Sequence, residues 1–315
     1  MKKLIVLAII MAVMVLVAAL AHAQAPPNDL KPTFISPTPG LYVNGWPAFT
    51  LSYPKEWVET PVAAQISEGL MAGAVRPGSE ELSPLLSIAV FVNGLPLEDW
   101  AKIHLPFFMA VSTDVKVLSD KPLQLKDGTR AREAEFEFVP KVDLSGRSVK
   151  NPAKHNVLYL ATKRDLTWVT IFLVDDRGRI GEDLKEIAYS LTFQSDREKP
   201  VNVPLDVKAF LDMYCADVVG HDVKTIMAHY SDRFLQFGAS KAFTERGFRN
   251  DPLYLGQAGP SLEATVTVFE PHGDKAYIDG FFLRSFKPIL SLKAAMGVQQ
   301  IVNEHGQWKW FGNQK

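Results

Sequence analysis

A break in the apolar pattern at residues 194–204 constrains the fold of this chain more than any other feature. The segment contains the run Ser-Asp-Arg-Glu-Lys-Pro and ends in a further proline, and it separates two stretches with strong helix and strand periodicity. The chain has 315 residues, which is more than a single typical hydrophobic core accommodates. We therefore predict two domains, at 41–195 and 205–315, joined by a linker at 196–204.

The chain begins with the pattern of a segment that directs export. Lys2 and Lys3 precede an unbroken apolar run of 18 residues at 4–21, which closes on the small-x-small sequence Ala-His-Ala. This order predicts a cleavable signal peptide at 1–23 and a periplasmic or secreted protein. Because the run is just long enough to cross a bilayer, an uncleaved membrane anchor is the alternative. The proline-rich stretch at 24–40 is predicted to be an extended tether.

Charge and cysteine content exclude several classes of protein. Lysine and arginine total 34, and aspartate and glutamate total 35, so no net positive field attracts nucleic acid. Cys215 is the single cysteine of the sequence, so the chain forms no internal disulfide and its stability rests on packed cores. The sequence has no phosphate-binding loop, dinucleotide fingerprint or Gly-x-Ser-x-Gly elbow, and no cofactor is predicted.

The N-terminal domain is predicted to be a sheet with helices packed against it. Some strands alternate between apolar and polar residues and have one buried face, whereas two are apolar on both faces and suit the centre of a sheet. The sequence Lys-Asp-Gly-Thr at 126–129 indicates a hairpin turn. The predicted strands lie at 49–53, 85–92, 134–138, 157–161 and 168–174, and the predicted helices at 96–107, where Pro106 ends or kinks the helix, and at 184–191.

The C-terminal domain is predicted to place its helices before its strands. Val207, Phe210, Leu211, Tyr214 and Cys215 follow helical spacing and define a long amphipathic helix. Helices followed by a strand meander indicate an α+β domain. Shorter helices are predicted around 223–230, with Asp222 as the N-cap, and at 241–249, and strands are predicted at 264–270, 275–284, 298–302 and 308–311.

Each domain resembles a known family. The segment "FTLSYPKEW" at 49–57, the Asp-Gly hairpin and "IAYSLTF" near 190 resemble the PsbP-like fold, which implies a binding or accessory module without catalytic residues. The segments "YSDRF", "GDKAYI" and "GQWKWFG" resemble the nuclear transport factor 2-like superfamily and its SnoaL-like members. That resemblance implies a curved sheet wrapped around helices to form a cone, which holds a small apolar ligand, catalyses isomerase or cyclase reactions, or only mediates dimerisation.

Six residues of the C-terminal domain are candidates for a ligand pocket in this cone. Tyr214 and Asp279 match the tyrosine and carboxylate that the resemblance implies for isomerases, because an apolar cavity raises a carboxyl pKa towards neutrality. Tyr277 and Phe281 are predicted to lie on the same face of the strand as Asp279, which favours a position for all three inside the cone. We nevertheless favour the alternative, in which Asp279 is structural and accepts hydrogen bonds from a neighbouring turn. The remaining candidates are Trp308 and Trp310, for which core packing is an equal explanation.

No metal site or reactive thiol is predicted. His221, Asp222, His229 and Asp232 lie close together in the sequence, but the spacing of the two histidines gives no shared helix or strand face for one metal ion. Capping and surface roles are therefore favoured. Cys215 faces the core by its helical phase, which favours a packed thiol over a nucleophile.

The sequence favours an exported, non-enzymatic binding or accessory protein of the cell envelope. The partner predicted for it is a small apolar molecule or another envelope protein. The alternative is an isomerase or cyclase that uses the C-terminal cone. A homodimer through the C-terminal domain is a further hypothesis, because sheets of the second family often pair back to back and the chain has a dense aromatic set at Phe281, Phe282, Phe286, Trp308, Trp310 and Phe311.

Overall fold

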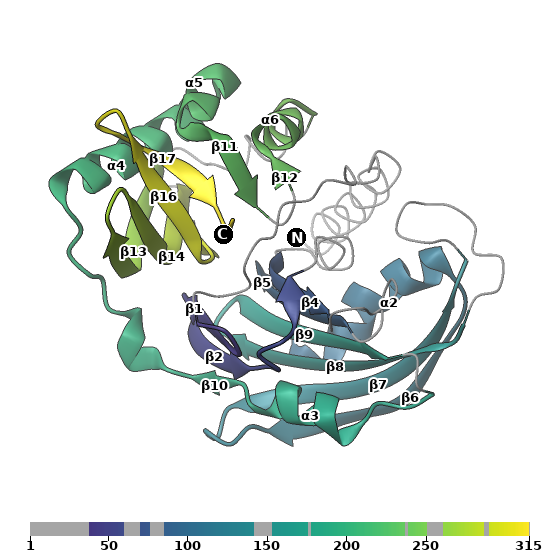
Figure 1. Ribbon diagram of the computed structural model, residues 1–315. Coiled ribbons are helices and arrows are strands. Elements are labelled where there is room, and N and C mark those ends of the chain that lie inside the picture. The colour runs from purple at the N-terminus through teal and green to yellow at the C-terminus, as the bar shows by residue number, and fades with distance from the viewer. Residues whose placement is uncertain are drawn as a thin grey trace.

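The chain folds into an α+β architecture of open sheets with packed helices (Figure 1). The signal peptide predicted at 1–23 lies outside the residues described here, as does most of the predicted tether. The computed structural model describes residues 38–59, 70–75, 85–141, 153–175, 178–236, 239–250, 261–286 and 290–314.

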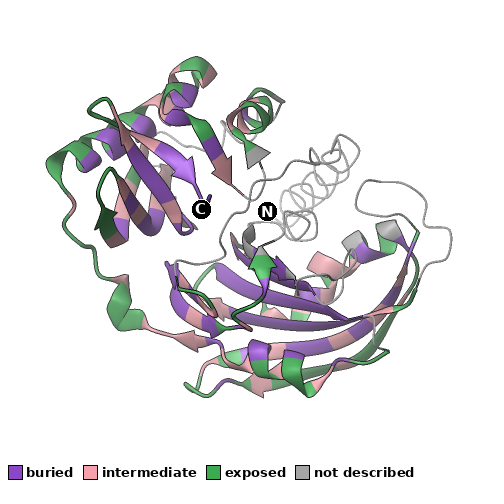
Figure 2. Cartoon of the chain, in the orientation of Figure 1, coloured by how far each residue is buried: buried purple, intermediate pink, exposed green. Residues whose placement is uncertain are grey.

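The N-terminal part is built on a seven-stranded antiparallel sheet in the order β3-β4-β5-β9-β8-β7-β6. The strands β8 and β9 at its centre are buried along nearly all of their length (Figure 2). This agrees with their apolar residues on both faces. The strands are β3 (Val58–Glu59), β4 (Leu70–Val75), β5 (Leu85–Val92), β6 (Ser112–Gln124), β7 (Arg130–Pro140), β8 (His155–Arg164) and β9 (Thr167–Asp175).

One face of this sheet is covered by helix. The short 3₁₀ turn η2 (Leu97–Asp99) leads into α2 (Trp100–Val111). The Trp100 ring stacks on that of Tyr159 with 5.1 Å between centroids, and Phe108 packs edge-on against Phe136 at 4.8 Å. These aromatic side chains form a dry layer between helix and sheet.

The opposite face is covered by α3 (Glu182–Tyr189) and by a small antiparallel sheet. This sheet contains β1 (Leu41–Gly45), β2 (Ala48–Ser52) and β10 (Thr192–Phe193), with β2 in the middle. The apolar stripe of α3 that the sequence predicts lies in this core. The large sheet is therefore the middle of three layers.

The predicted linker is held at both of its ends. It begins with a 3₁₀ turn, η3 (Ser195–Glu198), in which Glu198 accepts a hydrogen bond from the Ala48 N–H at 2.9 Å. Further on, the Val201 N–H donates to the Val266 carbonyl at 2.9 Å, so the linker lies along the edge of the C-terminal sheet. These contacts tie the linker to both parts of the chain.

The C-terminal part begins with two helices, as predicted, but two strands then precede its third helix. Its sheet runs in the order β12-β11-β17-β16-β14-β13, with β15 also paired to β14, and α4 packs against β13 and β17. None of the helices in the described ranges has the length and apolar character needed to span a membrane. The elements are α4 (Leu205–Gly220), α5 (Val223–Ala228), β11 (Tyr230–Gln236), β12 (Ala239–Ser240), α6 (Lys241–Asn250), β13 (Ser261–His272), β14 (Lys275–Phe286), β15 (Leu290–Ala295), β16 (Gln299–Glu304) and β17 (Gln307–Gly312).

Several elements differ from the sequence predictions: Tyr230, predicted to lie in a short helix, begins β11, and the strands β4 and β15 were not predicted. Pro106 does not end α2, which continues to Val111. A proline inside a helix costs about 3 kcal/mol, and here the burial of Trp100 and Phe108 on either side of it offsets that cost. The strand β6 was not predicted, because it is an edge strand whose side chains are almost all exposed or half-exposed, so it has no apolar alternation.

Candidate functional site

The turn between β1 and β2 reaches the C-terminal sheet, and β1 contacts both β13 and β14 (Figure 1). Asn44 organises this turn from its base. It accepts a hydrogen bond from the Tyr42 hydroxyl at 2.8 Å and donates from Nδ2 to the Pro47 carbonyl at 2.9 Å. Because Tyr42 and Asn44 are buried, these bonds hold Gly45 and Trp46 in one orientation towards the C-terminal sheet.

Asp279 lies on β14 and meets this turn with a buried carboxyl, since only 1% of the residue is exposed. Its Oδ2 accepts a hydrogen bond from the Gly45 N–H at 2.6 Å, and its Oδ1 accepts from the Gly280 N–H at 2.7 Å. Burial raises the pKa of this carboxyl to about 7, while hydrogen bonds from the N–H groups of Gly280, Gly45 and Gly297 act in the opposite direction. The carboxyl therefore joins residues 234 positions apart in the sequence.

A β-bulge in β13 aims a second polar group at the same turn. The register between β13 and β14 shifts between Val266 and Val268, which makes Thr267 the extra residue. Its hydroxyl donates to the Gly45 carbonyl at 2.9 Å. A Cβ at Gly45 would lie 2.7 Å from Cγ of Asp279, so the contact requires a glycine for space.

An aromatic contact completes this arrangement. Trp46 packs on Phe281, with 5.4 Å between the ring centroids. The Lys293 ammonium lies over both rings, 4.4 Å from the centroid of Phe281 and 5.4 Å from that of Trp46. The turn between β1 and β2 thus covers the part of the sheet face that carries Phe281. We call the set Gly45, Trp46, Thr267, Asp279 and Phe281 the domain joint.

Three other candidate residues lie on the opposite side of the C-terminal sheet. The Tyr214 ring packs against Trp310 with 5.4 Å between centroids, and its hydroxyl oxygen lies 3.3 Å from that of Tyr230. Trp308 is half-buried, and its Nε1 donates to a carboxylate oxygen of Asp206 at 2.8 Å. All three belong to the core beneath α4.

The structure therefore does not bring the six candidate residues together. Ala276 and Ile278 of β14 point into the core beneath α4, and Asp279, next to Ile278 in the strand, points away from it. Tyr277 and Asp279 therefore lie on the face of the sheet opposite the helices, whereas Tyr214 lies on the side of the helices. A single proton-transfer site cannot include both Tyr214 and Asp279 in this arrangement.

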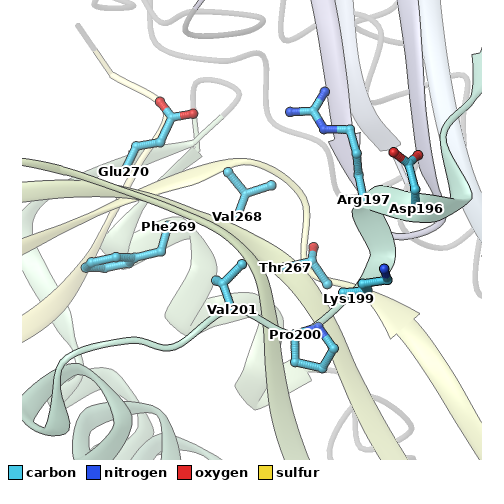
Figure 3. Close-up of a pocket in the computed structure, with 9 residues that line it drawn as sticks. All are labelled: Asp196, Arg197, Lys199, Pro200, Val201, Thr267, Val268, Phe269 and Glu270. Carbon is cyan, nitrogen blue, oxygen red and sulfur yellow. The ribbon is translucent and has the colours of Figure 1, made fainter.

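An open groove of about 350 Å³ lies beside the linker (Figure 3). One wall is formed by Asp196 and Arg197 of η3 together with 199–201, and the other by 267–270 of β13. The rim carries charges of both signs, and aliphatic carbon lies between them. Because the groove follows a sheet edge and is open to solvent, its shape suits an extended peptide segment better than an enclosed apolar ligand.

The histidines and aspartates near α5 have separate structural roles. Asp222 caps α5 by accepting a backbone N–H at 2.9 Å, and His221 is the left-handed residue that ends α4. His229 Nε2 lies 2.6 Å from an oxygen of Asp217. Asp232 forms an ion pair on the surface. Within the described ranges, no three side chains of metal-ligating type form a group that could hold an ion.

Cys215 lies in the core beneath α4, as its helical phase predicts. Burial raises the pKa of its thiol to about 12, with a smaller contribution from Asp212. The thiolate is therefore suppressed at neutral pH, and this residue is not a nucleophile in the folded protein.

Sequence reasoning missed the N-terminal half of the domain joint. The sequence Gly-Trp-Pro at 45–47 stands between two alternating runs and is itself a turn signal. Nothing in the sequence marks Thr267 as a bulged residue, because bulges depend on how two strands pair. Lys293 lies on β15, a strand that the periodicity did not predict.

Comparison with known proteins gives distant similarities only. No family model matches the chain, and no curated protein matches it. The cyanobacterial PsbP of Synechocystis sp. PCC 6803 has a similar solution structure, with 14% identity over 50% of this chain and 95% of that one, and a TM-score of 0.37. A crystal structure from Bacteroides thetaiotaomicron VPI-5482 has 12% identity, covers 89% of each chain and has a TM-score of 0.32. An NTF2-like protein involved in plasmid conjugation has 10% identity, covers 70% of this chain and 88% of its own, and has a TM-score of 0.20. With TM-scores this low, these similarities assign no activity to the chain.

Proposed function

We propose that this chain is an exported, non-enzymatic binding protein of the cell envelope, with a PsbP-like domain followed by an NTF2-like domain. The observation that carries the proposal is the separation of Tyr214 from Asp279 by the C-terminal sheet. Each has a packing role on its own side: Tyr214 lies in the core beneath α4, and Asp279 lies in the domain joint. The tyrosine and the carboxylate on which the isomerase or cyclase alternative was based therefore lie on opposite faces of the sheet and do not form one acid–base pair.

The proposed partner is an extended segment of another envelope protein, bound in the groove between the linker and β13. Val201 already donates one hydrogen bond to this sheet edge, at Val266. An additional strand beside 267–270 would extend the same pattern, since edge strands add peptides through backbone hydrogen bonds. Arg197 and Lys199, both exposed, offer contacts to acidic residues of such a segment, while Asp196 and Glu270 offer contacts to basic ones.

Native mass spectrometry of protein purified from its own source tests this proposal. A bound mass of a peptide or protein that leaves on denaturation is the expected result. An extra mass of only a few hundred daltons would instead support the second proposed partner, a small apolar molecule. A bare chain under all native conditions would contradict both partners.

Variants then locate the bound segment. The double change Arg197→Ala/Lys199→Ala in the groove is expected to weaken binding at least tenfold, whereas Lys224→Ala, an exposed lysine on α5, is the matched control and should not change it. Equal affinity for both variants would rule out the groove as the binding site.

The alternative function, an isomerase or cyclase, has one observation in its favour, which is the pKa of about 7 at the Asp279 carboxyl. The variant Asp279→Asn separates the two proposals, because an enzyme that uses this carboxyl loses turnover. A turnover measured in the wild-type protein and abolished in this variant would replace the binding proposal with the enzymatic one.

A further inference from the structure

Helix α4 has two apolar sides, and only one of them lies in the core of the C-terminal part (Figure 1). A second apolar set follows helical spacing on the opposite side, and its members are all exposed: Leu205, Ala209, Met213 and Ala216. Leu205 is 86% exposed and Met213 is 56% exposed, the former being the highest value among the large apolar side chains of the described ranges. A surface helix ordinarily has polar residues on this side, so the set, which we call the α4 stripe, indicates an interaction surface.

Charged residues border the α4 stripe along both of its sides. On one side Lys208 and Asp212 form an ion pair one turn apart, and their side chains are 61% and 59% exposed. On the other side lie Asp206 and Asp217, and each of these carboxylates is bound by another side chain of the C-terminal part. The side with Lys208 and Asp212 is therefore the one that offers charges of both signs to a partner.

We propose that the α4 stripe binds the α4 stripe of a second copy of this chain, with the two helices antiparallel. A twofold axis through the middle of α4 places Leu205 opposite Ala216 of the second copy. The same axis places Ala209 opposite Met213. A long side chain therefore meets a small one at every position along the stripe, which allows the two helices to approach closely.

The charges beside the stripe fit the same axis. In an antiparallel pair with twofold symmetry, the same side of each helix meets its copy, so Lys208 of each chain lies opposite Asp212 of the other. Both ion pairs then form between the copies as well as within each chain. A parallel pair would instead bring each residue against itself, and Lys208 would face Lys208. Charge and side-chain size thus favour the antiparallel arrangement together.

The aromatic set that the sequence suggested for a homodimer does not offer such a surface. Phe281, Trp310 and Phe311 are each less than 10% exposed in the single chain. The α4 stripe, in contrast, is exposed along its whole length. With 16 residues, α4 supplies fewer than the roughly 20–30 residues that each partner contributes to a standard interface. We therefore expect a reversible dimer with a dissociation constant of roughly micromolar size.

Sedimentation velocity of the purified protein between about 1 μM and 1 mM measures this association. The wild-type chain should shift from monomer to dimer over that range. Met213→Asp places a carboxylate in the middle of the stripe and should weaken the association at least about tenfold. Lys208→Asp and Asp212→Lys should each weaken it about tenfold, because each brings like charges together in its own homodimer.

A mixture of the two charge variants separates contacts between copies from contacts within a chain. Opposite charges then face each other at both positions, so Lys208→Asp and Asp212→Lys should associate with one another about as tightly as the wild-type chain does with itself. The pair within each chain remains broken in both variants, so a role confined to one chain predicts no recovery.

The matched control is Lys102→Asp, which changes an exposed lysine on α2 that also pairs with an aspartate of its own chain, and it should keep the wild-type dissociation constant. A wild-type chain that stays monomeric over the whole range would overturn the proposal. A dimer that the folded α4 variants leave unchanged would assign the contact to another surface and would overturn it too, as would a mixture that does not recover. None of these variants changes a residue of the groove, so the proposed function stands or falls separately.

Discussion

The substitution Gly45→Ala tests whether the domain joint stabilises the fold. The added Cβ would lie 2.7 Å from Cγ of Asp279 and 2.9 Å from its Oδ2, both well inside ordinary contact distance. Relieving such an overlap costs about 1–3 kcal/mol. If the turn moves away, the 2.6 Å hydrogen bond is also lost and a buried carboxyl loses its partner, which costs about 1–3 kcal/mol more. We expect a total loss of about 2–6 kcal/mol.

The assay is urea unfolding followed by tryptophan fluorescence, with Gly94→Ala as the matched control. A Cβ at Gly94 meets nothing within 4 Å, so that variant should be unchanged or about 0.4–1 kcal/mol more stable. In an Asp279→Gly background the new methyl group no longer meets Cβ, Cγ or Oδ2 of residue 279, and its cost should fall by more than about 1 kcal/mol. If Gly45→Ala and Gly94→Ala are equally stable, or if the two joint substitutions are additive, the joint does not hold the domains as argued.

Three further predictions concern other parts of the chain. Gly312→Ala should destabilise by more than about 2 kcal/mol in thermal unfolding, because Gly312 has φ +85° and its Cβ would lie 2.1 Å from the Leu235 carbonyl oxygen; an unchanged melting temperature would contradict this. Asp222→Ala should cost about 1 kcal/mol in urea unfolding, because the carboxylate caps α5; no loss would show that the cap is dispensable. Cys215 should react with a thiol reagent at pH 8 only after denaturation, since burial raises its pKa to about 12; rapid labelling of the native protein would contradict its burial.

The cores of both domains follow from residue spacing, whereas the edges do not. The stripe of α4 and the apolar strands β8 and β9 are buried as predicted, because periodicity reports which side of an element avoids water. The strands β6 and β15 were missed for the opposite reason. β6 has no buried neighbour on its outer edge, and β15 is a short strand that pairs only with the outer half of β14, from Phe281 to Phe286.

The candidate site shows a second limit of periodicity, which lies in β14. Alternation correctly separates Tyr277, Asp279 and Phe281 from Ala276 and Ile278, but it does not say which set faces the helices. In an ordinary two-layer domain the more apolar face of a strand points towards the helices, so the sequence would identify that face. In this protein the second face of β14 is also covered, by the turn at 45–48 from a domain that lies more than 200 residues earlier in the chain. Asp279 and Phe281 are therefore buried on that face, just as Ala276 and Ile278 are on the other. The contact that gives Asp279 its role is set by how the two domains dock, and no local pattern around Asp279 encodes that geometry.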